Sequence, residues 1–205
     1  MIPIEQLIFI LDKVGIVACA FTGVSLGVKK NLDLFGLMVV GVASAIGGGI
    51  VRDVILGRVP LVISNITYLE FAVVTSIIAV LLFYFKRKIP NKIILYADML
   101  GLGAFAAAGA TVSLSLHLGL LHTILLSIIS AVGGGVIRDI VLNDIPHILK
   151  REIYASAAGI GGMIAYLTFS INSDMNASAF FALISTIIVR LIADKKKFNL
   201  PKLEQ

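Results

Sequence analysis

One short motif, Gly-Gly-Gly-x-x-Arg-Asp, occurs twice in this chain, at residues 47–53 and 133–139. Three consecutive glycines cost a helix about 1 kcal/mol each relative to alanine. A helix interrupted there would expose carbonyl oxygens that can replace part of a cation's hydration shell. Close helix packing would use the same glycines, but because the triplets are matched we favour interrupted, pore-lining helices. The candidate pore residues are Gly47, Gly48, Gly49, Gly133, Gly134 and Gly135, with the hydroxyls of Ser44 and Ser130.

Charged side chains follow each glycine triplet within the same apolar run. Such charges are expensive inside a membrane and normally face the bundle interior or a water-filled cavity. Arg52 and Asp53 lie near one end of their run, and Asp12 lies at a similar depth in the preceding run. We therefore predict an Asp12–Arg52 ion pair at one mouth of the bundle, which either flanks a cation path or only holds helices together. The equivalent residues at the other mouth are Asp98, Arg138 and Asp139.

The chain has no residue pattern typical of an enzyme. It lacks a nucleophile–base arrangement, a zinc motif and the Gly-Lys-Ser/Thr of a phosphate-binding loop. The single cysteine, Cys19, excludes a disulfide within one chain. The histidines have no metal-binding spacing, so we expect no catalysis, no cofactor and no metal. The net charge of +5 does not indicate nucleic-acid binding, because there is no soluble scaffold to carry a basic face.

The composition predicts that these residues lie on membrane-spanning helices. Of the 205 residues, 59% are hydrophobic and only 14% are charged, whereas an average soluble domain is about a quarter charged. A span needs roughly 20 apolar residues, and the connections are too short to separate soluble domains. We therefore predict an all-α integral membrane protein, a single domain over residues 1–205. The seven expected spans are about Leu7–Val28, Leu34–Leu56, Tyr68–Phe85, Ile93–Leu116, Leu120–Leu142, Ile153–Ile171 and Ser178–Ala193.

Lysine and arginine are concentrated on one side of this expected topology. Cytoplasmic connections carry an excess of basic residues, so we predict an extracellular N-terminus and a cytoplasmic C-terminus. Contact with anionic lipids accounts for most of these side chains. The residues on the predicted cytoplasmic side are Lys29, Lys30, Lys86, Arg87, Lys88, Lys92, Lys150, Arg151, Lys195, Lys196, Lys197 and Lys202.

The first half of the chain is repeated in the second. A shift of 86 residues places Asp12 on Asp98, Gly23 on Gly109, and the first Gly-Gly-Gly-x-x-Arg-Asp on the second. Because each unit has three spans, an odd number, the second unit enters the membrane from the opposite face. We therefore predict an inverted repeat, an architecture used by transporters. The units cover about residues 5–88 and 92–172, and an accessory helix follows at about 178–194.

The paired motif and its repeat distance resemble prokaryotic members of the trimeric intracellular cation (TRIC) channel family, over about residues 5–195. The resemblance implies a homotrimer with a pore in each protomer, lined by second and fifth helices that the glycine triplets kink. It also implies permeability to monovalent cations, chiefly potassium. The Lys-Glu-Val motif of eukaryotic members is absent. Size and composition then favour the cell membrane, with membrane lipids as the other partners.

The leading hypothesis is therefore a passive, potassium-permeable cation channel. Carbonyl and hydroxyl oxygens would solvate the ion, while the aspartates attract cations and the arginines offset them. The alternative is a secondary transporter of a small zwitterion such as glycine, since inverted helices suit alternating access equally well. A purely structural membrane scaffold is the third hypothesis.

Overall fold

The computed structural model describes residues 2–85, 89–150 and 153–196. Within these ranges the regular secondary structure is entirely helical. Seven helices are long and apolar enough to cross a membrane, which confirms the predicted all-α, seven-span membrane fold. They are α1 (Ile4–Lys29), α2 (Leu34–Ile55), α4 (Thr67–Phe85), α5 (Asn91–Ser115), α6 (Leu120–Val141), α8 (Ile153–Asn172) and α9 (Met175–Lys196).

Several residues used to predict orientation cannot be placed. These are Lys86, Arg87, Lys88, Arg151, Lys197 and Lys202, which lie outside the described residues.

Two short helices, α3 (Leu61–Ser64) and α7 (His147–Lys150), were not predicted from the sequence. They follow Pro60 and Pro146, which occupy equivalent positions in the two repeat units. Four residues are too few for apolar periodicity to distinguish a helix from a loop. Each short helix brings a backbone amide to the charged end of the preceding long helix, as described below.

The helices that carry the glycine motif end in matching left-handed turns. Gly57, after α2, has φ 67° and Asn143, after α6, has φ 54°. Glycine adopts this conformation freely and asparagine tolerates it. In each turn the next amide donates back into the helix, from Arg58 to the carbonyl oxygen of Asp53 at 3.1 Å and from Asp144 to that of Asp139 at 2.8 Å. This capping pattern ends both helices two residues after their Arg-Asp pair.

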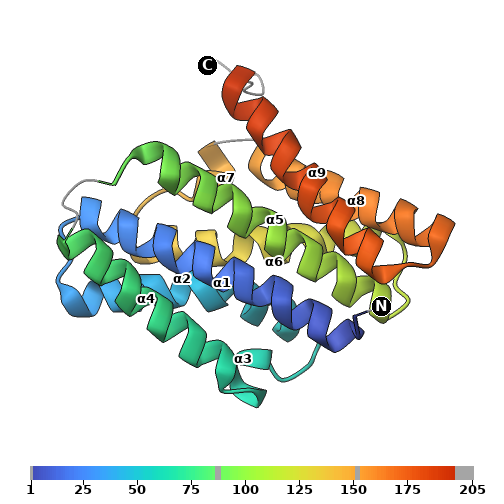
Figure 1. Ribbon diagram of the computed structural model, residues 1–205, viewed down its shortest axis with the longest axis horizontal. Helices are drawn as coiled ribbons and strands as arrows, with labels where there is room; N and C mark the ends of the chain where they lie inside the picture. Colours follow the sequence, from blue (N-terminus) through green and yellow to red (C-terminus); the bar gives the residue numbers. More distant parts are fainter. Residues whose placement is uncertain (1, 86–88, 151–152, 197–205) are drawn as a thin grey trace.

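The helices of the two units are arranged in equivalent ways (Figure 1). α1 packs against α2 and α4, and α5 packs against α6 and α8. The units meet where α1 contacts α5 and α2 contacts α6. α9 lies outside this arrangement and covers α5 and α8. The centre is α5, whose alanines from Ala104 to Ala110 are fully buried because their small side chains allow close approach of the neighbouring helices.

Candidate functional site

α2 and α6 cross at the middle of their glycine triplets. A Cβ atom at Gly48 would overlap with the carbonyl oxygen of Ser130 on α6. A Cβ atom at Gly134 would overlap in the same way with the carbonyl oxygen of Ser44 on α2. These two contacts are reciprocal, since each residue of one contact lies 86 positions from its equivalent in the other. The middle glycines are therefore the points at which the two backbones come closest.

The glycine triplets do not interrupt their helices. Both α2 and α6 remain α-helical across Gly47–Gly49 and Gly133–Gly135, so the predicted interruption is wrong. A Cβ atom at Gly47 would lie 3.1 Å from the Cα atom of Gly134, and one at Gly133 would lie 3.1 Å from that of Gly48. Because the opposing backbone, rather than water, fills the space of the missing side chains, the helices have no reason to unwind there.

The third glycine of each triplet has a different environment. A Cβ atom at Gly49 would lie 3.8 Å from Nη2 of Arg52, and one at Gly135 would lie 3.7 Å from Nη2 of Arg138. These are ordinary van der Waals distances. The third glycines therefore face the guanidinium group of their own motif and not the opposing helix.

Ser44 and Ser130 lie at the crossing and are fully buried. Each packs beside a glycine of its own unit: a Cβ atom at Gly23 or Gly109 would come within 2.9 Å of the Cβ atom of Ser44 or Ser130, respectively. Neither serine hydroxyl has a hydrogen-bond partner among the described residues. An unpartnered buried hydroxyl is costly, and these two hydroxyls occupy equivalent positions, on side chains that pack against α1 and α5.

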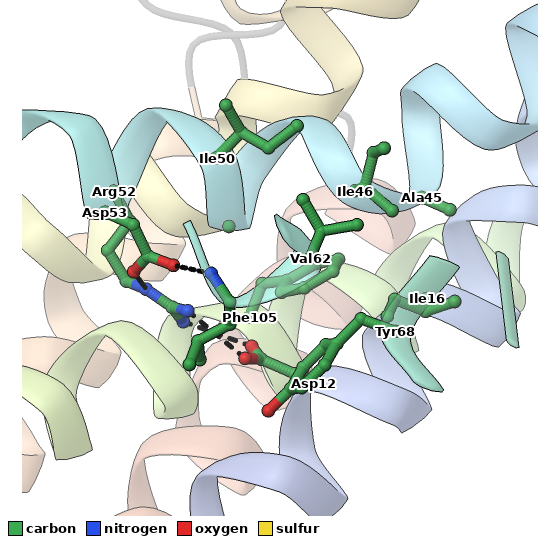
Figure 2. Close-up of a pocket in the computed structure, with 12 residues that line it drawn as sticks. Asp12, Ile16, Ala45, Ile46, Ile50, Arg52, Asp53, Val62, Tyr68 and Phe105 are labelled. Atoms are coloured by element: carbon green, nitrogen blue, oxygen red, sulfur yellow. Dashed lines mark hydrogen bonds and ion pairs between the residues drawn. The ribbon is translucent and has the colours of Figure 1, made fainter. Parts of the chain in front are cut away.

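The first mouth is the charged cluster at the end of α2 (Figure 2). Arg52, which is fully buried, donates from Nη1 and Nη2 to the two carboxylate oxygens of Asp12, at 3.1 and 3.2 Å. Its Nε donates to Asp53 at 2.9 Å. Asp53 also accepts from Nη2 of Arg58 at 2.6 Å and from the amide of Leu61, the first residue of α3, at 2.9 Å. Two carboxylates thus neutralise two guanidinium groups.

The second mouth is the equivalent cluster at the end of α6. Nε of Arg138 donates to Asp139 at 2.8 Å, and its Nη1 lies 3.8 Å from Asp98. Asp139 accepts from the amide of His147, the first residue of α7, at 2.8 Å. Asp98 also accepts from the hydroxyl of Tyr154 at 3.2 Å. The structure therefore brings the predicted partners together at both mouths.

The two mouths differ in three respects. The Asp12 side chain is 3% exposed, whereas the Asp98 side chain is 21% exposed. Arg58 contributes a cation to the first mouth, but the equivalent residue of the second unit is Asp144. His147 places its ring Nδ1 3.0 Å from Asp139, where the first unit has a leucine. The sequence analysis did not identify the residue differences at Arg58/Asp144 and Leu61/His147, although the 86-residue shift aligns each pair directly.

Hollows open beside both mouths. At the first, a hollow of about 20 Å³, which is enough for about one water molecule, lies beside Asp12 and Arg52 and is lined by Phe105 and Tyr68 (Figure 2). A larger hollow of about 480 Å³ borders the same mouth at Arg58 and Leu61. The hollow beside the second mouth measures about 370 Å³ and is lined by Asp98 and Arg138. In the described ranges, no three His, Cys, Asp or Glu side chains are arranged to hold a metal ion.

Known structures share this fold over nearly the whole chain. A TRIC cation channel, solved to explain conductance, matches with a TM-score of 0.86 and 34% identity, covering 96% of this chain and 97% of that one. A prokaryotic TRIC channel crystallised in 0.5 M KCl matches with a TM-score of 0.85 and 35% identity, covering 96% and 100%. This chain belongs to the prokaryotic TRIC family. A TRIC orthologue from Rhodobacter sphaeroides matches with a TM-score of 0.84 and 27% identity, covering 93% and 98%.

Sequence relatives of this TRIC-family chain carry other descriptions. The inner membrane protein YadS of Escherichia coli K12, a UPF0126 protein, is 36% identical over 200 residues, which is 96% of each chain. A UPF0126 membrane protein of Deinococcus radiodurans is 34% identical over 196 residues, covering 93% of this chain and 89% of that one. The family profile described as "Glycine transporter" matches residues 9–86 and again 95–170. Its second match begins 86 residues after the first, at the displacement of the internal repeat.

Proposed function

We propose that this chain is a passive channel for monovalent cations, chiefly potassium, with a path through each protomer. Its matched solved structures are TRIC cation channels, which supports the cation part of the proposal. The main observation in support of a path is an arrangement that occurs in both repeat units. Hollows beside two aspartate–arginine clusters lie on either side of a helix crossing that holds two unpartnered hydroxyls.

In this proposal, a two-fold axis in the membrane plane relates the two repeat units. α1 to α4 and α5 to α8 each include three spans, so the second unit enters from the opposite face. The reciprocal contacts of Gly48 with Ser130 and of Gly134 with Ser44 support such an axis, because a two-fold operation exchanges a contact with its equivalent.

A cation would approach through either hollow and cross the middle between α2 and α6. The carboxylates of Asp12 and Asp98 offset the positive arginines at the mouths and lower the electrostatic barrier to a cation. At the crossing, the hydroxyl oxygens of Ser44 and Ser130 would replace part of its hydration shell. Since Gly48 and Gly134 hold the two backbones in contact, conduction requires α2 and α6 to separate there. The structure thus corresponds to a closed state in this proposal.

We further propose a homotrimer in the cell membrane with a cytoplasmic C-terminus. Two contacts support the assignment of connections to one face. Nζ of Lys30, after α1, lies 2.8 Å from Asp144, after α6. Nζ of Lys29 donates to Asn91, at the start of α5, at 3.1 Å. The first, third and fifth connections therefore meet at one end of the bundle, as the positive-inside assignment requires.

Recording in planar bilayers tests the channel directly. Purified protein between solutions of unequal KCl concentration is expected to give unitary current steps that reverse near the potassium equilibrium potential. Saturable uptake of a solute without current steps would contradict the proposal. The assembly is checked on the same sample by native mass spectrometry, where three copies are expected.

Replacing both central serines is expected to lower current without loss of stability. In the Ser44→Ala/Ser130→Ala double variant, the buried hydroxyls that have no protein partner are removed. Stability is therefore expected to stay within about 0.5 kcal/mol of the wild type. Loss of ion solvation of roughly 1 kcal/mol would lower unitary conductance by about fivefold. Unfolding in detergent and conductance are measured on one preparation, and unchanged conductance would argue against a path at the crossing.

A secondary transporter of a small zwitterion is the second candidate. The profile described as "Glycine transporter" matches both repeat units, and hollows on either side of a closed crossing suit alternating access. Radiolabelled glycine uptake into proteoliposomes distinguishes the candidates. A carrier saturates with glycine concentration and exchanges glycine across the membrane, whereas a cation channel accumulates none.

A further inference from the structure

The seventh span carries a buried arginine that lacks a counter-ion in the part of the chain that the structure describes. Arg190 of α9 is 4% exposed, and its Nε has no hydrogen-bond partner there. Among residues 2–85, 89–150 and 153–196, no carboxylate lies within ion-pair distance of its guanidinium group. Its guanidinium group lies over the aromatic ring of Tyr154, whose centroid is 5.3 Å from Cζ. Because burying an unpaired charge costs free energy, an anionic group bound beside Arg190 would be stabilising.

Arg190 lines the hollow of about 370 Å³ beside the second mouth. Lys29 lines the same hollow, and its Nζ donates to the neutral side-chain oxygen of Asn91. Arg138, also at this hollow, differs because Asp98 and Asp139 lie close to it. Two cations that have no carboxylate partner among the described residues thus face one space, which has the size of a small-molecule pocket.

We propose that this hollow binds the carboxylate group of a small molecule at Arg190. The planar fork of a guanidinium group matches the two oxygens of a carboxylate. A singly charged group is favoured over a phosphate dianion, because Asp98 and Asp194 line the same hollow and repel the second negative charge. α9 lies outside the repeat, so the first mouth has no equivalent of this site.

Asp194 selects between two kinds of carboxylate ligand. It lies one turn beyond Arg190 on α9, lines the hollow and makes no ion pair with the described residues. A ligand with an ammonium group beside its carboxylate would satisfy both side chains, as an α-amino acid does. A simple carboxylate would satisfy Arg190 alone. The site lies in a hollow that the proposed cation path also uses, but its occupancy is measurable without any current.

Saturation-transfer NMR with acetate and with glycine, on the full chain in detergent micelles, tests this site. Both ligands are expected to bind with dissociation constants of about 1 mM. Arg190→Gln is expected to weaken both by at least about tenfold, since it removes a charge-assisted hydrogen bond. Lys195→Gln, an exposed change near the end of α9, is the matched control and is expected to leave both unchanged. Arg190→Lys keeps the charge but loses the fork, so intermediate binding is expected.

The outcomes separate the two ligand classes. If Asp194→Asn weakens glycine but not acetate, the site takes zwitterions; if it weakens neither, the site takes simple carboxylates. Binding that Arg190→Gln leaves intact, or no binding to correctly folded wild-type protein, overturns the proposal. Size-exclusion profiles and unfolding temperatures establish that each variant is folded. A negative binding result would leave potassium currents unaffected, so it is distinct from failure of the channel proposal.

Discussion

Gly48→Ala is expected to destabilise the bundle by at least about 3 kcal/mol. The added methyl group would overlap with the carbonyl oxygen of Ser130, a backbone atom that moves only if α2 and α6 move apart. Overpacking of a tight core typically costs about 1–3 kcal/mol, and here two long helices must shift together. Gly134→Ala is expected to behave in the same way against the carbonyl oxygen of Ser44.

The same triplet supplies the matched control. Gly49→Ala adds its methyl group at an ordinary 3.8 Å from Arg52, and alanine favours a helix over glycine by about 1 kcal/mol. We expect this variant to unfold at the wild-type temperature or above it, whereas Gly48→Ala unfolds well below it. Thermal unfolding followed by size-exclusion fluorescence gives the comparison. Equal stability of the two variants would contradict the backbone contact at the crossing.

Arg52→Leu is expected to cost about 3–5 kcal/mol, the range for breaking a buried ion pair from one side. Asp53 would keep Arg58 as a partner. Asp12, whose side chain is 3% exposed, would keep no cation within ion-pair distance among the described residues. Adding Asp12→Asn to Arg52→Leu removes the stranded charge, so the double variant is expected to recover much of the lost stability.

The equivalent ion pair at the second mouth provides a comparison for these Arg52 and Asp12 variants. Arg138→Leu is expected to cost less than Arg52→Leu, because the Asp98 side chain is 21% exposed and lies 3.8 Å from Arg138. Asp139 would retain its contacts with His147. Unfolding temperatures of the single and double variants at both mouths measure the difference. Equal losses at the two mouths would show that the difference in burial has no energetic effect.

The membrane spans and the aspartate–arginine pairs could be predicted from the sequence for simple physical reasons. Apolar length alone predicts each span to within a few residues. The depth of Asp12 and Arg52 in neighbouring runs predicts their contact, because a buried charge needs a partner. The 86-residue shift then transfers the pairing to Asp98 and Arg138.

Other features depend on packing that no local pattern reveals. Glycine triplets are consistent with either a broken helix or a close crossing, and the choice depends on whether water or another backbone faces them. Here the facing atoms belong to Ser130 and Ser44, so α2 and α6 remain continuous. Arg190 lies outside the repeat, so the shift that identifies the other charges gives no information about it. The helices α3 and α7 are too short to carry a periodic signal.

The reciprocal crossing has a consequence for the history of the chain. In the inverted arrangement proposed above, a separate three-pass unit with this crossing surface would pair with a second copy of itself inserted upside down, because the contact of Gly48 with Ser130 and that of Gly134 with Ser44 are equivalent. An unfused ancestor would therefore have needed to enter the bilayer in both directions. In that arrangement, fusion of the two copies would fix one in each direction and would allow positions 58 and 144, now arginine and aspartate, to diverge. Co-expression of the two halves, divided between α4 and α5, is accordingly expected to rebuild the bundle.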